Sequence, residues 1–289
     1  MSLVFVHGGV SGTGKDSLPS LSHTLEDARA HSSSLDAVEA AVLALENHPA
    51  LNAGYGAVVT RAGTIELDAG IAQAGAGYGA VTCVDVRNPV SLARWVMEKT
   101  PHVFMAGAGA TELARAAGLE PLGDTTGEQR GRWERARSTG TLSLDSFGGS
   151  EHVDTVGAVA VGDDGRPAVA SSTGGVFGKM PGRVGDSPVL GAGLMVTERA
   201  AVVGTGVGEL FLETLACARC ARLIDDGTHP ADACAEVIEA LARRRASAAG
   251  LLALDSGGRM GAAYRGGSWA VEGPDGPVDA ICVGPAKEE

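Results

Sequence analysis

The sequence predicts an α+β fold in which antiparallel sheets are covered by helices. Its β-rich runs come in pairs joined by glycine-rich turns, and its helical periodicities gather in separate pairs, without the alternation typical of βαβ units. The length of 289 residues and the hydrophobic fraction of 44% suit a globular domain with a substantial core. We therefore expect a single domain over residues 1–289.

Helical periodicity and turn residues define the elements expected in the first half of the chain. Apolar residues between Leu35 and Leu45 recur at steps of three and four, and Ser33 with Asp36 resembles a capping box ahead of them. Pro89 fits the first position of the next helix. The expected elements are strand 3–7, helix 32–46, a turn at 51–56, strands 57–60 and 64–67, and helices 88–96 and 103–117.

A polar segment at 120–153 separates the two halves of the chain. It is rich in Gly, Ser, Thr and Arg and has neither helical nor strand periodicity, so we interpret it as an exposed linker. Glycine-rich turns fill residues 174–193. The other elements expected beyond the linker are strands 156–161 and 167–171, helices 208–226 and 230–249, strands 251–255 and 259–264, and a last strand 279–283.

Composition excludes several classes of function. The net charge is −12, and the 23 basic residues are scattered apart from a triplet at 243–245, which argues against a nucleic-acid partner. No run approaches the ~18 apolar residues of a membrane span. Five cysteines without framework spacing, and no leader ahead of them, favour a reduced, cytoplasmic protein.

Thr155 stands where the polar linker meets the first buried strand of the second half. A threonine hydroxyl is a weak nucleophile without a base, but an N-terminal threonine carries one in its own α-amine, whose reference pKa is about 8. Freeing that amine requires cleavage of the Asp154–Thr155 bond, through attack of the Thr155 hydroxyl on the Asp154 carbonyl and an N-to-O acyl shift. The structural alternative is that Thr155 merely begins a strand, where β-branched residues are common.

A second hydroxyl, Thr173, is expected close to the first. The hairpin made by strands 156–161 and 167–171 returns the chain to its starting point, so the residues that follow it come back beside Thr155. The alternative is a polar strand end followed by a glycine turn at 174–175. With Thr173 in reach, the nucleophile interpretation of Thr155 becomes stronger.

Two turn-rich segments add substrate-binding chemistry. Arg183 and Asp186 lie three apart, and an arginine fork binds a carboxylate while a neighbouring aspartate holds an ammonium group, so the pair suits an amino-acid head group. A surface ion pair in a loop is the alternative. Thr205 and Gly206 precede a helix, where a hydroxyl and backbone N–H groups can face a developing oxyanion.

In this order the segments resemble the plant-type, or type III, L-asparaginases, also called isoaspartyl peptidases, of the N-terminal-nucleophile (Ntn) hydrolases. The resemblance covers nearly the whole chain and is strongest at 155–159, 172–175, 181–188 and 204–208. It implies a four-layer αββα sandwich of two antiparallel sheets covered by helices. It also implies self-cleavage into an α subunit, 1–154, and a β subunit, 155–289, and hydrolysis of L-asparagine and β-aspartyl dipeptides through an acyl-enzyme.

The resemblance also assigns roles within the site. Thr155 would be the nucleophile, Thr173 the hydroxyl that assists it, and Thr205 with Gly206 the oxyanion hole. Substrate contacts would fall to Arg183, Asp186 and Gly208, with Asn52 supporting them. The resemblance implies no catalytic cofactor, a small amino-acid or dipeptide substrate and a homodimer of αβ protomers, and composition already argues against membrane and nucleic-acid partners.

A structural sodium ion is a further implication of the resemblance. Family members bind sodium through main-chain carbonyls of the loop that steadies the nucleophile, and such ligands leave no side-chain signature. The corresponding carbonyls here belong to Leu45, Glu46, His48, Leu51, Ala53 and Tyr55.

Two departures from the family pattern stand out. Asp154 replaces the glycine usual before the nucleophile, a junction closer to that of aspartylglucosaminidase, and it leaves the rate of self-cleavage open. Residues 70–75 read Gly-Ile-Ala-Gln-Ala-Gly where the family commonly has a Met-Asp-Gly turn. The preferred leaving group, whether ammonia, an amino acid or a glycosylamine, is not fixed by these residues.

Two other motifs suggest different functions for this chain. The stretch 9–16 nearly spells a phosphate-binding loop, but Asp16 replaces the required Ser or Thr and would repel phosphate. Cys217 and Cys220 have metal-site spacing without a second pair, so core cysteines are the better interpretation. An aspartylglucosaminidase-like enzyme and an uncleaved, non-catalytic binding homologue remain as alternatives, although the binding homologue should show damage to the site residues.

Overall fold

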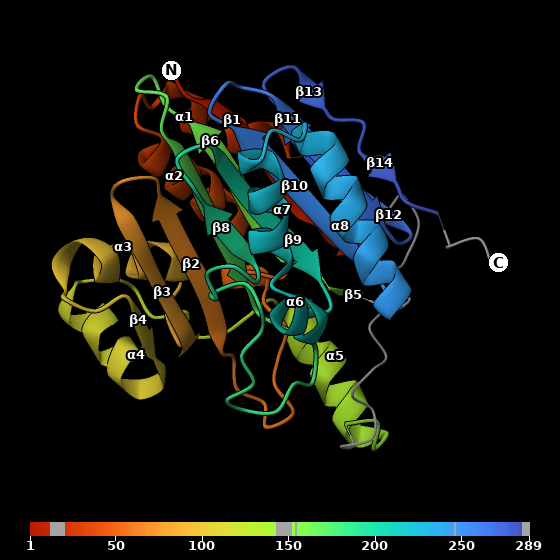
Figure 1. The fold of residues 1–289 in the computed structure, drawn as a ribbon. Coiled ribbons are helices and arrows are strands. Elements are labelled where there is room, and N and C mark those ends of the chain that lie inside the picture. The colour runs from red at the N-terminus through yellow and green to blue at the C-terminus, as the bar shows by residue number, and fades with distance from the viewer. Residues whose placement is uncertain (12–20, 143–151, 154, 246, 285–289) are drawn as a thin grey trace.

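The computed structural model of the chain describes residues 1–11, 21–142, 152–153, 155–245 and 247–284. Within these ranges fourteen strands form two mixed sheets, and eight α-helices and one short 3-10 helix accompany them (Figure 1). The α+β class expected from the sequence is therefore confirmed.

The larger sheet holds the hairpin of residues 156–173 near its middle. Its strands are β1 Leu3–Ser11, β2 Leu67–Gln73, β3 Gly77–Val84, β4 Phe104–Ala106, β5 His152–Val153, β6 Val156–Val161, β7 Pro167–Thr173, β12 Ser268–Gly273 and β13 Gly276–Pro277. They run in the order β13-β12-β1-β6-β7-β2-β3-β4, and β5 pairs with the end of β1. All neighbours are antiparallel except β3 and β4, which are parallel.

The smaller sheet packs against the larger one and supplies the strand that carries Thr205. Its strands are β8 Leu194–Val196, β9 Ala200–Gly206, β10 Ala249–Asp255, β11 Met260–Arg265 and β14 Ile281–Cys282. The order is β14-β11-β10-β9-β8, antiparallel except for the parallel pair of β11 and β14. Strands β6 and β7 contact β9 across the space between the sheets.

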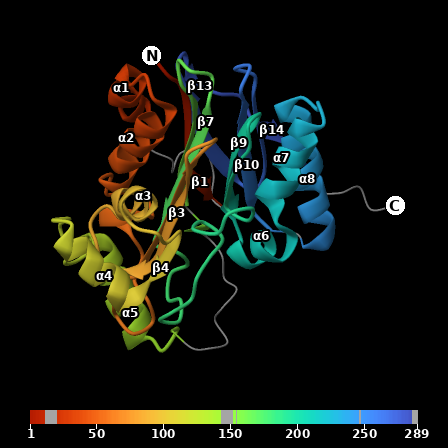
Figure 2. The same ribbon diagram turned by 60° about the vertical axis from the view of Figure 1, so that its left-hand side comes forward.

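The helices lie mainly on the two outer sides of the paired sheets. They are α1 Ser22–Ala30, α2 Ser34–Glu46, η2 Gly54–Gly56, α3 Pro89–Lys99, α4 Gly107–Ala116, α5 Gly127–Ser138, α6 Gly208–Thr214, α7 Ala216–Asp225 and α8 Pro230–Arg244. In Figure 2, α1 to α3 flank the larger sheet, and α7 and α8 flank the smaller one on the opposite side. The same pairing follows from the contacts of α2 with β6 and β7 and of α8 with β10 and β11.

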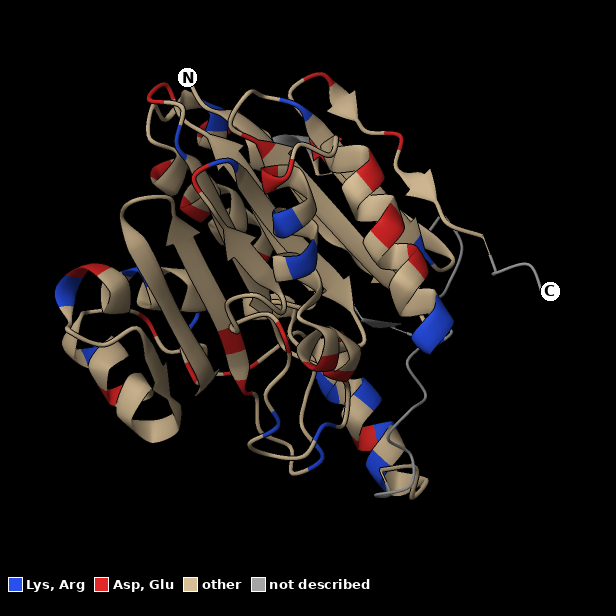
Figure 3. Cartoon of the chain, in the orientation of Figure 1, with Lys and Arg blue, Asp and Glu red and all other residues tan. Residues whose placement is uncertain are grey.

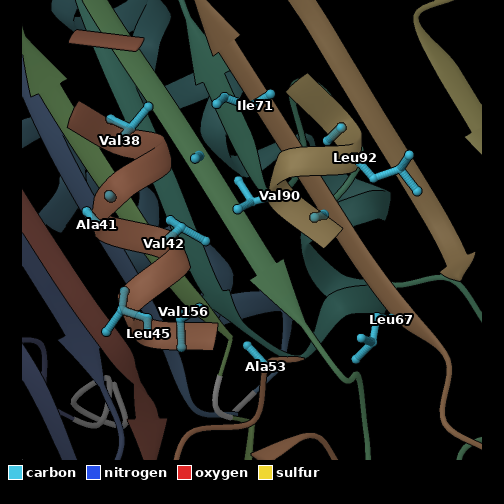
Figure 4. Close-up of a cluster of buried hydrophobic side chains, with 14 of the residues drawn as sticks. Val38, Ala41, Val42, Leu45, Ala53, Leu67, Ile71, Val90, Leu92 and Val156 are labelled. Atoms are coloured by element: carbon cyan, nitrogen blue, oxygen red, sulfur yellow. The ribbon is translucent and has the colours of Figure 1, made fainter. Parts of the chain in front are cut away.

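Strand periodicity divides the buried side chains between separate cores. On β6, Val156 and Ala158 face the helices while Val159 packs between the sheets. On β10, Leu251 packs toward α7 and α8, and Leu252 points between the sheets. Both faces of these strands are buried, which is why they read as continuous apolar runs. Figure 4 shows the helix-facing core, where Val156 lies near side chains of α2.

Several predicted elements are confirmed. Helix α2 begins after Ser33, whose hydroxyl accepts from the Asp36 N–H at 3.5 Å, although the Asp36 carboxylate pairs with Arg94 instead of completing a capping box. Helix α3 begins at Pro89, and the β6–β7 and β10–β11 hairpins lie where they were expected. Cys217 and Cys220 are fully buried core residues of α7.

The two strands predicted at 57–60 and 64–67 were wrong, apart from Leu67, which begins β2. Residues 57–60 and 64–66 are irregular, and the real hairpin is β2–β3, which runs through the glycine-rich segment 70–75. The glycines there and in β3 allow close packing: a Cβ on Gly70 would lie 3.1 Å from a methyl of Leu194, and one on Gly79 would lie 2.1 Å from the Ala93 carbonyl oxygen. The segment 70–75 resembles a turn in composition because strands β2 and β3 need small residues for this close packing.

Other boundaries were also placed wrongly. The helix predicted at 103–117 begins only at Gly107, after β4, and the one predicted at 208–226 is interrupted by left-handed Leu215. The helix predicted to reach residue 249 ends at Arg244, because Ala249 pairs with Gly206 of β9. Strand β1 continues past its predicted end to Ser11 through a bulge, and β12 was not predicted.

The segment 120–153, interpreted as an exposed linker, contains a helix that the sequence did not predict. Helix α5 occupies Gly127–Ser138 and buries none of its residues, so no apolar periodicity marks it. The Thr126 hydroxyl caps it, and the Arg132 guanidinium stacks on Phe177, 4.0 Å from the ring centroid. Figure 3 shows how densely arginines populate this helix. Residues 143–151 lie outside the described residues.

Charged residues are concentrated on helices and loops, and the strands are almost free of them (Figure 3). Among the described residues, no helix is both long and apolar enough to cross a membrane. The phosphate-loop-like stretch 9–16 falls largely on residues 12–20, outside the described part of the chain.

Candidate active site

The hairpin of β6 and β7 brings two threonine hydroxyls together. Val156 pairs with Ser172 in the antiparallel register, so Thr155, one residue before, comes back beside Thr173. The Thr155 Oγ1 donates to Thr173 Oγ1 at 3.4 Å, and both side chains are buried. This distance exceeds that of an ordinary O–H···O bond, as catalytic contacts often do without substrate. The expected proximity is therefore present.

Thr173 is fixed by the turn that follows it. The Gly175 N–H donates to Thr173 Oγ1 at 3.0 Å, which leaves the hydroxyl oriented by a backbone group. Asn52 holds the same turn through two hydrogen bonds. Its side-chain Nδ2 donates to the Gly175 carbonyl at 2.6 Å, and its main-chain carbonyl accepts from the Gly174 N–H at 2.9 Å. A Cβ on Gly174 would lie 2.5 Å from Asn52 Oδ1, so only glycine fits there.

Ser187 is a third hydroxyl at the nucleophile that the sequence did not reveal. Its Oγ lies 3.4 Å from Thr155 Oγ1, and the residue is fully buried. It directly follows Asp186, so the loop that carries the head-group residues also touches the nucleophile. Within the turn-rich segment 181–188 the serine looked like an ordinary turn residue, and only its position after Asp186 hinted at a role.

Arg183, Asp186 and Gly208 form a compact group, as expected. A Cβ on Gly208 would lie 2.9 Å from both Arg183 Nη2 and Asp186 Oδ1, so the glycine leaves space between the two charged groups. Arg183 is held in a turn in which its N–H donates to the Met180 carbonyl at 3.0 Å. The arrangement presents one cationic and one carboxylate group to a small space.

Asp186 is a buried carboxylate that lacks a full set of partners. It is 3% exposed, and its Oδ2 has no hydrogen-bond partner within the described residues. Burial raises the pKa of Asp186 from 3.8 to about 7, and the nearby Arg183 charge only partly opposes this. An incoming ammonium group would satisfy the open oxygen and favour the charged carboxylate.

Glu209 is the second residue that sequence reasoning missed. Its carboxylate accepts from Arg183 Nε at 3.0 Å and from Nη2 at 2.8 Å. Although burial acts to raise the pKa of Glu209, the hydrogen bonds and charge of Arg183 lower it overall. Glu209 therefore occupies the edge of the Arg183 guanidinium that carries Nε and Nη2. The other edge of the guanidinium, which carries Nη1, does not bind Glu209.

Thr205 and Gly206 end strand β9 on the facing sheet. Thr205 is fully buried, and its Oγ1 accepts from the Val10 N–H at 3.4 Å, where Val10 pairs with Val153 just ahead of the junction. Gly206 has a φ of 149°, and a Cβ there would lie 2.8 Å from the Ala248 carbonyl oxygen. The described residues give no hydrogen bond between Thr205 and Thr155, and Asp154 lies outside them.

His7 is a buried neutral base beside the nucleophile. It pairs with Gly157 of β6, and neither ring nitrogen makes a hydrogen bond of ordinary geometry within the described residues. Burial lowers the pKa of His7 to about 3, and the Thr155 main chain raises it less. No triad motif surrounds His7 in the sequence, so nothing there pointed to this contact.

The predicted sodium loop contains carbonyl groups that converge on two glycines. A Cβ on Gly56 would lie 2.2 Å from the Leu51 oxygen and 3.0 Å from that of His48, and one on Gly54 would lie 2.5 Å from the Glu46 oxygen. Five of these six carbonyls also accept a hydrogen bond: Leu45 from His48 N, His48 from Leu51 N, Leu51 from Ala53 N, Ala53 from Gly56 N, and Tyr55 from Thr125 Oγ1. Across the described ranges, no group of three His, Cys, Asp or Glu side chains is placed to hold a metal.

Known proteins match this chain over most of its length. A family model described as asparaginase matches residues 12–272. An isoaspartyl peptidase of Salmonella typhimurium is 38% identical over 283 residues, covering 90% of each chain. A plant-type L-asparaginase of Thermococcus kodakarensis is 39% identical over 239 residues, covering 74% of this chain and 76% of its own.

A third relative bears on the alternative enzyme. An N(4)-(beta-N-acetylglucosaminyl)-L-asparaginase of Elizabethkingia miricola is 37% identical over 239 residues, covering 79% of this chain and 70% of its own. Together with the hydroxyl pair and head-group loop, these matches identify the chain as a member of the asparaginase family that includes the isoaspartyl peptidases and plant-type L-asparaginases.

Proposed function

We propose that this chain is a hydrolase of side-chain amides of aspartyl substrates, acting on L-asparagine and β-aspartyl dipeptides. The observation that carries the proposal is the contact of 3.4 Å between the Thr155 and Thr173 hydroxyls at the start of a buried strand. The head-group pair of Arg183 and Asp186 and the names of the relatives support the same substrate class.

Activation begins with cleavage of the Asp154–Thr155 bond. The Thr155 hydroxyl attacks the Asp154 carbonyl, the acyl group moves from nitrogen to oxygen, and water releases it. The products are an α subunit of 1–154 and a β subunit of 155–289, and the new α-amine becomes the base. The neutral His7 cannot compete for a proton near neutral pH, since its pKa lies near 3.

Hydrolysis then uses the freed threonine. The α-amine takes the Thr155 hydroxyl proton as Oγ1 attacks the side-chain carbonyl of the substrate, and the oxyanion is met by Thr205 Oγ1 and the Gly206 N–H. The protonated amine gives its proton to the leaving amine, and a β-aspartyl ester remains on Thr155. Water activated by the same amine hydrolyses this ester, and Thr173 orients the nucleophile throughout.

The head group is held by unequal partners. Asp186 pairs with the α-ammonium through its open oxygen, while Arg183 binds the α-carboxylate through the edge that Glu209 leaves free. Gly208 keeps the space between them open. This grip requires a free α-amine and α-carboxylate on the residue whose side-chain amide is cut.

The test is hydrolysis by the purified protein of three side-chain amides, which are L-asparagine, a β-aspartyl dipeptide and glycosylasparagine. We expect release of aspartate from L-asparagine and from the β-aspartyl dipeptide, and none from the matching α-aspartyl dipeptide, which is the control. The relative named for a glycosylated asparagine favours glycosylasparagine as the second candidate substrate. If it is cut much faster than the other two, the alternative enzyme is correct. If none is cut, the protein is a binding homologue.

Four broader features complete the proposal. The helices on the outer sides of the two sheets support a four-layer αββα sandwich of the Ntn-hydrolase type. We further propose that the cleaved αβ protomers form a cytoplasmic homodimer. Mass photometry or analytical ultracentrifugation tests the dimer. The carbonyls of His48 and Leu51 suit a hard cation such as sodium, which would steady the loop carrying Asn52. A melting temperature equal in sodium and choline chloride would contradict that role.

A further inference from the structure

Lys179 is buried under the active-site turn and has no part in the chemistry described above. Its side chain is 1% exposed, and its Nζ donates to the Glu66 carbonyl at 2.8 Å. The same Nζ lies 3.9 Å from Oδ2 of Asp68, a carboxylate with no exposed surface. Asp68 Oδ1 accepts from the Cys83 N–H at 2.9 Å, but its Oδ2 makes no hydrogen bond within the described residues.

Burying such a pair requires a physical reason. Desolvation of two charges costs several kcal/mol per ion, and apolar residues of similar volume are often equally stable or more stable in their place. The separation of 3.9 Å with one unbonded oxygen is a poor geometry for recovering that cost. Stability alone is therefore a weak explanation for Lys179 and Asp68.

The position of Lys179 supplies a functional reason. A Cβ on Gly175 would lie 2.8 Å from Lys179 Cδ and 2.9 Å from its Nζ, so the lysine stem lies directly against this glycine. Gly175 is the residue whose N–H holds the Thr173 hydroxyl. Asp68, the partner of the lysine, pairs directly with Thr173 across strands β2 and β7.

We propose that Lys179 is a positioning residue for the reaction: anchored on the Glu66 carbonyl and on Asp68, it supports Gly175 and so keeps Thr173 aligned with Thr155. The lysine acts through the turn and does not touch substrate. Catalysis is sensitive to such support, because a displacement of about 1 Å at the reacting groups can cost about 100-fold in rate. This inference rests on the proposed function.

The experiment compares Lys179→Met, Asp68→Asn and the double variant with wild type, and uses Lys99→Met, an exposed lysine of α3, as the matched control. For each protein, mass spectrometry gives the cleaved fraction, thermal denaturation gives the melting temperature, and L-asparagine hydrolysis gives kcat and KM per cleaved chain. We expect Lys179→Met to lower kcat about 10- to 100-fold with KM changed less than about threefold. Lys99→Met should match wild type.

The double variant separates positioning from charge balance. If Lys179 only neutralises Asp68, removing both charges should restore kcat, and that recovery would overturn the proposal. We expect the double variant to remain as slow as Lys179→Met, because Gly175 still lacks its support. A Lys179→Met protein that is folded but cleaves itself more slowly agrees with the proposal, since cleavage needs the same hydroxyls.

Two further outcomes are decisive. If Lys179→Met does not fold, Asp68→Asn takes its place, with a kcat at least about fivefold below wild type expected and an unchanged kcat contradicting the inference. A normal kcat with only a lower melting temperature in Lys179→Met would make the lysine purely structural. Failure of the proposed function looks different, because then wild type itself releases no aspartate.

Discussion

The two ends of the candidate site carry different kinds of side chain. At the nucleophile end, the side chains are uncharged hydroxyls. The hydroxyl oxygens of Thr173 and Ser187 each lie 3.4 Å from Thr155 Oγ1. At the head-group end, Arg183 and Asp186 are ionisable and lie on an irregular loop. Strand register places Thr155 beside Thr173. At the head-group end, by contrast, charge determines which ligand groups Arg183 and Asp186 can bind.

The two ends also differ in whether their polar groups already have hydrogen-bond partners. The Thr173 hydroxyl already has its backbone donor, Gly175, and needs nothing from a ligand to be oriented. Asp186 has a buried oxygen without a partner and a raised pKa, so an ammonium group would complete it. We infer that the nucleophile end is preorganised and that substrate binding completes the head-group end.

The largest effect is expected at Thr155. Thr155→Ala removes the nucleophile and should lower amide hydrolysis by about 10⁴-fold or more, to the assay background. Thr155→Ser keeps a hydroxyl and should retain measurable activity, so it is the matched control. Aspartate release from L-asparagine measures both variants. Near-normal hydrolysis by Thr155→Ala would place the nucleophile elsewhere.

Thr173 tests whether the nucleophile end is preorganised. Thr173→Val preserves shape but removes the hydroxyl that accepts a hydrogen bond from Thr155 Oγ1. We expect kcat to fall about 10²- to 10³-fold with little change in KM. Thr173→Ser should keep most of the rate because its hydroxyl can occupy the same place. Steady-state kinetics on fully cleaved protein distinguishes the two. A loss confined to KM would contradict the assignment.

Asp186 tests whether the head-group end is incomplete. Asp186→Asn cannot pair ionically with the substrate ammonium, so kcat/KM should fall about 10²-fold, mainly through KM. In wild type, kcat/KM should rise as pH increases through about 7, because Asp186 must lose its proton to bind the ammonium group. A profile that stays flat between pH 6 and 8, or a variant with unchanged KM, would remove Asp186 from substrate binding.

The same carboxyl predicts a cost in stability. Because its pKa rises from 3.8 to about 7 on folding, the stabilisation from the extra proton is present at low pH and is lost as pH rises through about 7. Asp186→Asn avoids the buried charge and should be up to about 4 kcal/mol more stable than wild type at pH 8, with the difference shrinking toward pH 4. Urea unfolding at both pH values measures this, and a variant less stable at pH 8 would contradict it.

The smallest effect is expected at Glu209. Glu209→Gln weakens one edge of the Arg183 fork but leaves the other for substrate, so KM should change by only about two- to fivefold and kcat should hold. Arg222→Gln, an exposed arginine paired with Asp226, is a control for surface ion pairs. A loss as large as that of Asp186→Asn would mean that Glu209 itself positions the substrate.

The sequence predicted the fold best where local rules agree with packing. Helix α2 combines a regular apolar stripe with the Ser33 cap, and the β6–β7 hairpin combines two fully buried strands with a turn of Gly and Asp. It failed at β2–β3, where Gly70 and Gly79 serve close packing. It failed again at α5, which has no buried face to give it a period.

The site was predictable where function requires a particular residue type in a particular motif. Thr155 lies beside Thr173, and Arg183 and Asp186 lie on either side of Gly208, as their segments implied. Ser187, Glu209 and His7 were not foreseen, because each gains its meaning from a neighbour distant in sequence. The buried Lys179 escaped notice for the same reason.

The most direct test of the central claim is the mass of the purified chain under denaturing conditions, beside that of Thr155→Ala. We predict that wild type separates into two fragments with the masses of residues 1–154 and 155–289, while the variant stays whole. A wild-type chain that remains intact after long incubation, or a variant cut at the same bond, would contradict it.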